Sequence, residues 1–389
     1  MRQHRTDAAR EPTDERRPVR GTGRPGVAVP AGVRHPRAGA ITELQRTAGN
    51  HVVARLLRGG ARGAAGTPTV QRAPYGLESP TSQGAYVAEA ARLRRTQPTM
   101  SLPAFAEALL TVVAGELKAA GVPPIRWTIK ESGSGPDGVF SSADWRVQVN
   151  TSAFSAQKSP PKELRLLTDA ELTAAAGTLY HEARHADQDV VIIRNLLAQK
   201  KTVGQVVAAT GIRRKAVEAV ASTTYAAPLD ADQAARADRM YDVMYGANKQ
   251  LLTLLMTHRS LFAGLGALAT PGSRLSDGAR HVTTLATWQS TALTPALARL
   301  AASKNLTAAQ ADLHRRLQAV DAEITALLFV WKAARAKKPA PSAVDDVRVA
   351  AADTRDALNE AYRSLESEAD AFRVEGLVST ALTQKLVKP

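Results

Sequence analysis

Apolar residues recur at helical spacing through most of the chain beyond residue 84, and this pattern predicts a mostly helical protein. Helices are expected at 85–96 and 102–120. A longer run at 169–200 is predicted to form one continuous helix, because Thr168 and Glu171 make a capping-box pattern at its start. From residue 228 onward, further helices are expected at 230–265, 280–293, 295–303, 307–336 and 343–374.

Two short segments instead alternate strictly between apolar and polar residues, which predicts strands at 125–129 and 145–149. The segment 132–138 between them is rich in turn-forming residues. We expect a small antiparallel sheet just before the long helix, and hence an α+β, mostly α fold. The strand at 145–150 is expected at the sheet edge beside that helix, where an extended peptide can pair with it; a plain structural hairpin is the alternative.

The long helix carries the pattern His181-Glu182-x-x-His185 at its middle. Two histidines four residues apart lie on one helix face, about 6 Å apart along the axis, so both imidazoles can reach one metal ion. Glu182 is rotated away from that face, so it can contact a water bound to the metal without binding the metal itself. The pattern predicts a Zn²⁺ site of the hydrolase type. The alternative is a solvated polar helix face.

A third ligand must be a histidine or a carboxylate, because the chain has no cysteine. The stretch 365–372, with Glu-x-x-x-Asp and an inner Glu-Ala-Asp, resembles the second zinc motif of His-Glu-x-x-His peptidases of the prenyl-protein endopeptidase type. That resemblance implies Glu366 as the ligand and Asp370 as the residue that orients a histidine. Since the roll of the helix is not known from sequence, Glu368 is an alternative, with Asp230 and Asp232 as fallbacks. A solvated acidic face also remains open.

The oxyanion of a peptidase reaction needs a donor, and Tyr180, Tyr362 and Arg184 are the candidates by their place in the sequence. The chain departs from the resembled family in two ways. It has no apolar run long enough for a membrane helix. The interval between the two metal motifs is also long, which implies a helical insertion at about 201–342 and a long C-terminal helical bundle.

The N-terminal segment 1–83 differs from the rest in composition. Residues 1–73 hold fourteen arginines against five acidic side chains, a large part of the formal net charge of +15. Residues 1–39 have almost no large apolar residues, so disorder is expected there. The segment 40–58 has apolar residues at helical spacing and is predicted to form a short amphipathic helix. The chain is therefore divided into a basic leader, 1–83, and a zincin-like domain, 84–389.

Part of the leader resembles a known type of segment. The run 44–57, LQRTAGNHVVARLL, followed by a linker and Val70-Gln71-Arg72, is similar to the leader of cargo proteins of extracellular contractile injection systems. The resemblance covers residues 40–73 and implies association with a phage-tail-like particle. It implies synthesis in a bacterial cytoplasm and export by that particle, since no classical signal peptide is present. An arginine-rich tail with one stray helix is the alternative.

A helical hairpin at 202–217, with basic residues at the start of its second helix, is a candidate for DNA contact. Ordinary packing is the expected role, because aromatic residues are only 4% and most positive charge lies in the leader. Taken together, the sequence predicts a zinc-dependent metallopeptidase acting on a protein substrate, as a toxin or effector cargo. The alternatives are a non-catalytic cargo protein with a degenerate zincin scaffold and a DNA-binding protein.

Overall fold

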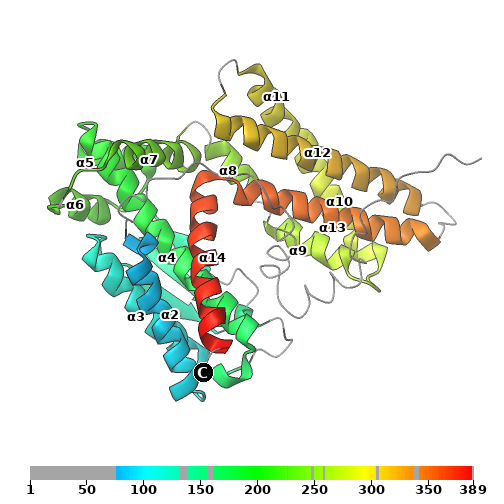
Figure 1. The fold of residues 1–389 in the computed structure, drawn as a ribbon. Coiled ribbons are helices and arrows are strands. Elements are labelled where there is room, and N and C mark those ends of the chain that lie inside the picture. Colours follow the sequence, from blue (N-terminus) through cyan, green and yellow to red (C-terminus); the bar gives the residue numbers. More distant parts are fainter. Residues whose placement is uncertain are drawn as a thin grey trace, which may run out of the picture.

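The computed structural model describes residues 76–131, 138–155, 157, 161–225, 227–246, 249–256, 259–303, 306–335 and 341–387 (Figure 1). The leader helix expected at 40–58 and the particle-association motif lie outside the described residues. The described part is mostly helical and contains one small sheet. None of its helices is both long and apolar enough to cross a membrane.

The first half of the described chain builds a helical unit around the sheet. In order, its elements are η1 (Gly76–Glu78), α2 (Pro80–Thr96), α3 (Leu102–Ala119), β1 (Arg126–Lys130), β2 (Gly138–Ser141), β3 (Arg146–Asn150), η2 (Thr151–Phe154), η3 (Leu164–Leu166), α4 (Asp169–Ala198), α5 (Val203–Thr210), α6 (Arg214–Ser222) and α7 (Ala231–Met244). The hairpin expected at 202–217 is α5 and α6, joined at Gly211, whose φ of 70° suits a glycine.

Helix α4 is the central element of this unit, and its prediction is confirmed. It begins where the capping box was expected: the Thr168 side chain accepts from the Glu171 N–H, and the Glu171 carboxylate accepts from the Thr168 N–H. Residues on all its faces are buried, because α3, α7, α14 (Glu366–Val387) and β2 pack around it. Figure 1 shows α14 beside α4.

The sheet differs from the expected one. Its strand order is β1-β3-β2, with β1 parallel to β3 and β2 antiparallel to β3, so the sheet is mixed and the antiparallel prediction is wrong. The segment 145–150 was expected at the edge beside the metal helix, but β3 lies in the middle of the sheet. The strand beside α4 is β2, which is only four residues long and carries no clear alternation.

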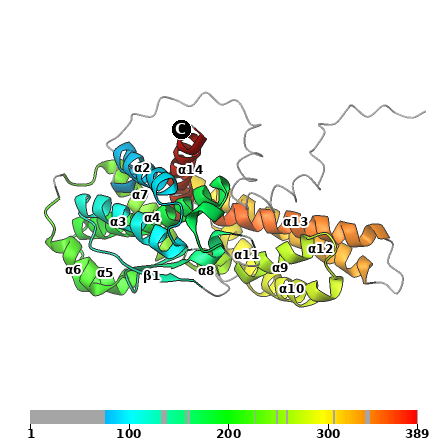
Figure 2. The same ribbon diagram turned by 90° about the horizontal axis from the view of Figure 1, so that it is seen from below.

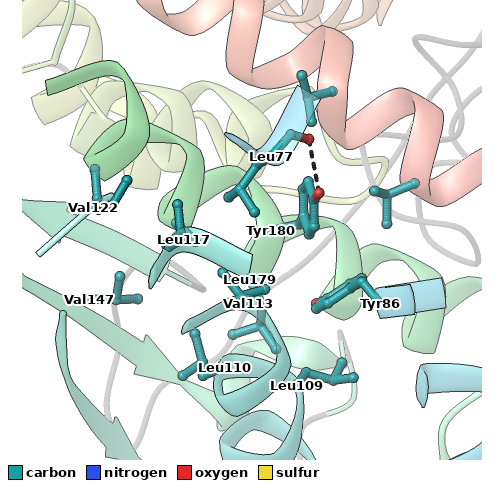
Figure 3. Close-up of a cluster of buried hydrophobic side chains, with 14 of the residues drawn as sticks. Leu77, Tyr86, Leu109, Leu110, Val113, Leu117, Val122, Val147, Leu179 and Tyr180 are labelled. Carbon is teal, nitrogen blue, oxygen red and sulfur yellow. Dashed lines mark hydrogen bonds between the residues drawn. The ribbon is translucent and has the colours of Figure 1, made fainter. Parts of the chain in front are cut away.

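The ordered unit includes residues before the expected boundary at 84. Leu77 has no exposed surface, and its carbonyl accepts a hydrogen bond from the Tyr180 hydroxyl (Figure 3). Its N–H donates to Asp187 Oδ2 at 3.0 Å. Because Leu77 joins the core that packs on α4, the segment Gly76–Glu78 belongs to the fold rather than to the leader.

A second helical unit has its own hydrophobic core. Its elements are α8 (Lys249–Met256), α9 (Arg259–Ala269), α10 (Leu275–Trp288), the π-helical turn η4 (Gln289–Leu293), α11 (Thr294–Ala302), α12 (Ala308–Ala334) and α13 (Pro341–Arg363). Figure 2 shows this bundle to one side of the unit built on α4. Helices α5–α7 pack into the first core, so the insertion with a separate core spans about 249–365 rather than 201–342.

Two expected helices are broken. The segment 230–265 divides into α7, α8 and α9, and the segment 343–374 divides into α13 and α14. The second break, at Ser364 and Leu365, is important for the site because it lets α14 leave the bundle and run along α4. The acidic motif at 366–370 therefore lies in the first turns of a new helix.

Candidate metal centre

Three metal-ligating side chains meet where α14 crosses α4. His181 and His185 face each other with their Nε2 atoms 3.2 Å apart. The Glu368 carboxylate lies opposite, with Oε2 at 3.5 Å from His181 Nε2 and Oε1 at 3.7 Å from His185 Nε2. One ligand atom from each residue lies within 4.8 Å of the others. The histidine pair expected from the sequence is therefore placed to share one ion with a carboxylate from α14.

These three residues fit a divalent cation. Glu368 is 4% exposed, and its Oε2 has no hydrogen-bond partner in the described part of the chain. A buried carboxylate oxygen without a donor is costly unless something else binds it. Because the two oxygens of this carboxylate face the two imidazole nitrogens, a cation held among the three groups would satisfy all of them. The sequence prediction of a metal site agrees with this geometry.

The third ligand is not the residue expected first. The Glu366 carboxylate pairs with Arg239 at 3.0 Å and does not join the cluster. Two residues correspond to about 200° of rotation on a helix, so Glu366 and Glu368 point to nearly opposite sides of α14. The alternative, Glu368, occupies the ligand position. The fallback Asp230 caps α7, where its side chain accepts from two backbone N–H groups.

Each histidine has a second partner on the far side of its ring. His181 Nδ1 lies 3.0 Å from Glu375 Oε2, and His185 Nδ1 lies 2.9 Å from Gln188 Oε1. With Nδ1 engaged, the Nε2 of each ring faces Glu368. Such partners fix the tautomer and orientation of a ligating histidine. Helix α14 thus supplies both the ligand Glu368 and the supporting Glu375, seven residues or two turns apart.

Close packing of α4 against α14 makes this contact possible. A Cβ added at Gly177 would lie 2.7 Å from Ser379 Oγ and 3.1 Å from Glu375 Cγ, so a larger residue would push the helices apart. The His181 ring also packs edge-on against Phe372, with ring centroids 4.5 Å apart. Sequence reasoning missed Gln188 and Glu375. The available signal was their spacing, one turn after His185 and two turns after Glu368.

Asp370 does not contact a histidine directly, although the sequence predicted that it would orient one. Its Oδ2 accepts from Gln188 Nε2 at 2.8 Å and from Arg184 Nε at 2.9 Å. It therefore supports His185 only through Gln188. Burial disfavours the charge on Asp370, but Arg184 and Arg236 outweigh burial and hold its pKa below the usual value.

The charges of the cluster are strongly coupled. Burial opposes a charge on His181, but the carboxylates of Glu368 and Glu375 beside the ring outweigh burial and raise the pKa of His181 to about 10. Burial likewise opposes ionisation of Glu368, yet His185 and His181 lower its pKa to about 2. Without a metal, a proton on His181 therefore balances the carboxylates at neutral pH. A cation bound by the neutral ring would take over this role and displace that proton.

Of the proposed oxyanion donors, two are committed elsewhere. The Tyr180 hydroxyl donates to Leu77 O, and the Arg184 guanidinium is buried among carboxylates. Tyr362, near the end of α13, hydrogen-bonds the Glu368 carboxylate and helps to keep its pKa low. It is the one candidate of the three with a described contact to the cluster.

No family model, no curated protein and no solved structure matches the chain. The interpretation of the site therefore depends on its own geometry and chemistry.

Proposed function

We propose that the protein is a zinc-dependent metallopeptidase with His181, His185 and Glu368 as its ligands. Two imidazole nitrogens and one carboxylate oxygen form a ligand set of catalytic zinc sites, which keep a fourth position open. The observation that carries the proposal is the buried Glu368 carboxylate: its Oε2, which has no hydrogen-bond partner in the described chain, faces His181 Nε2, and its Oε1 faces His185 Nε2.

A zinc ion bound there supplies Lewis acidity, which polarises a peptide carbonyl and acidifies a water molecule. Glu182 follows His181 on α4, is 7% exposed, and is the carboxylate that takes the proton and passes it to the leaving amine. Tyr362 is the oxyanion-donor candidate nearest the cluster, and it would have to exchange its hydrogen bond to Glu368 for one to the oxyanion. Glu375 and Gln188 keep the two rings aligned.

The substrate we propose is a protein segment in extended conformation. Strand β2 is an outer strand of the sheet and borders α4, so an extended peptide that pairs with its backbone groups other than the Phe140 N–H, which Glu182 accepts, would run past the histidine pair. This assigns to β2 the role that the sequence had suggested for 145–150.

Changing Glu182 to Gln tests the mechanism. The change removes the base but leaves all three ligands in place, so we expect zinc to remain at about one ion per chain. Turnover of a denatured protein such as unfolded casein should fall by about 10²–10⁴-fold. Metal analysis and a cleavage assay measure the two effects. The proposal would be contradicted if the wild-type chain did not bind zinc, or if the Glu182→Gln variant cleaved the substrate at the wild-type rate.

For the leader, we propose association with a contractile injection particle, on the resemblance at 40–73 alone. A chain lacking residues 1–73 should lose association with a purified particle while it keeps its zinc content, since the deletion leaves every described element intact. Sedimentation with the particle measures the first property and metal analysis the second. Equal sedimentation of both chains would contradict this role.

A further inference from the structure

Strand β2 contacts the proposed base directly through its main chain. The Phe140 N–H donates to Glu182 Oε2 at 2.7 Å. Successive N–H groups of a strand point to alternate edges, and β2 pairs with β3 on one edge only. The bond to Glu182 on α4 therefore places the Phe140 N–H on the free edge. An N–H given to an ionised carboxylate forms a strong, short hydrogen bond. The carboxylate is thereby held by backbone rather than by another side chain.

Gly138 is required for this approach. A Cβ at that position would lie 2.7 Å from Glu182 Cγ and 3.1 Å from Thr178 Cγ2. Residues two apart on a strand point to the same face, so Gly138 and Phe140 lie on one side of β2. Any side chain at 138 would therefore push the strand away from α4 and lengthen the contact to Glu182.

A second contact fixes the far end of the strand. Ser142 follows β2 directly, and its hydroxyl lies 3.0 Å from the Tyr245 hydroxyl, which donates to Asp189 Oδ1 at 2.6 Å. Asp189 is fully buried and lies seven residues, or two turns, after Glu182 on α4. The strand is therefore attached to the metal helix at both ends, and the attachment near Gly138 is the one that contacts the base.

We propose that β2 is a positioning strand, which holds the Glu182 carboxylate beside the metal cluster through the Phe140 N–H. Gly138 is the residue that allows this contact. A role for this contact in catalysis rests on the proposed peptidase function. The contact between Phe140 and Glu182 does not depend on that function. In the alternative, β2 is only a structural edge and Glu182 is placed by α4 alone.

Amide hydrogen exchange of the full chain tests the contact without any assay of activity. Phe140 should exchange slowly in the wild type and at least about tenfold faster in Glu182→Ala, because its only described acceptor is gone. Glu182→Gln keeps an acceptor oxygen and should restore much of the protection. Unchanged exchange at Phe140 in Glu182→Ala would overturn the proposal.

Gly138→Ala tests the role of the strand in catalysis. We expect reduced Phe140 protection and reduced turnover, at unchanged zinc content, because no described hydrogen bond or ion pair joins β2 to the three ligands. Gly115→Ala on α3 is the matched control, since a Cβ there meets nothing within 4 Å. Wild-type protection and turnover in Gly138→Ala would overturn the proposal. If Gly138→Ala does not fold, the comparison of Phe140 exchange in Glu182→Ala and Glu182→Gln tests the contact instead. If the wild-type chain binds zinc and protects the Phe140 amide but cleaves no protein, the proposed peptidase function is refuted. The contact between β2 and Glu182 would still stand.

Discussion

Replacing Glu368 by Ala is expected to abolish tight zinc binding, whereas Glu366→Ala should leave it intact. Glu368 supplies the only carboxylate of the described three-residue cluster, and both of its oxygens face histidine nitrogens. Glu366 lies on the other side of α14, paired with Arg239 at the surface. Both substitutions are in the first turns of α14, so any general disturbance of that helix should be the same in the two variants. Only Glu368→Ala also removes a metal ligand.

Glu375→Gln should give an intermediate result. The amide can still accept from His181 Nδ1 but no longer as an anion, and loss of such support lowers metal affinity by about 10–100-fold. Competition with a coloured chelator measures all three affinities, with circular dichroism to confirm that each variant is helical. The expected order of weakening is Glu368→Ala, then Glu375→Gln, then Glu366→Ala. Zinc loss in Glu366→Ala with retention in Glu368→Ala would reverse the assignment.

The metal helix could be predicted because every signal for it is local. The capping box at Thr168 and Glu171 marks its start, and the spacing of His181 and His185 fixes their common face. Nothing outside 168–200 was needed to place both imidazoles on one side. The same local reasoning predicts Glu182 as the base, and its charge acts on the His181 ring.

The third ligand could not be decided in this way. Whether Glu366 or Glu368 faces the histidines depends on the roll of α14, which is set by packing against α4, a helix that ends 168 residues before α14 begins. The break at Ser364 and Leu365 adds to the difficulty, since the apolar pattern of 343–374 continues through it. A second hydrophobic core lies between the two metal motifs in the sequence. No local sequence pattern marks where the helices of that core begin and end.

The edge strand was misassigned for a related reason. Alternation favours 145–149 because Val147 and Val149 are buried on one face of the central strand. Strand β2 borders α4 and the site, and its close approach demands a glycine at 138. A short edge segment with Gly and Ser resembles a loop in sequence, so the strand next to the site is the one with the weakest pattern.

Arg184→Ala is expected to give the largest loss of stability, about 3–5 kcal/mol, because it leaves the fully buried Asp187 carboxylate without its cation. The other two carboxylates, Asp370 and Glu78, keep ion pairs with Arg236 and Arg373. Arg184 is 1% exposed and pairs with Asp187, with Asp370 at 2.9 Å and with Glu78 at 3.3 Å. These partners come from η1, α4 and α14, so one guanidinium joins the start of the fold to both helices of the metal centre. Asp187 has no exposed surface, so its carboxylate cannot reach water once Arg184 is gone.

Urea unfolding in the presence of a chelator measures this effect without a contribution from bound metal. Arg239→Ala is the matched control, because Arg239 also pairs with a carboxylate of α14 but is half exposed, and such surface pairs contribute about 0–1 kcal/mol. If Arg184→Ala does not fold, Arg184→Lys keeps the charge without the forked geometry and should be destabilised by less. Equal stability of the Arg184→Ala and Arg239→Ala proteins would mean that the buried network does not hold η1 and α14 against the metal helix. The geometry of the centre would then depend on apolar packing alone.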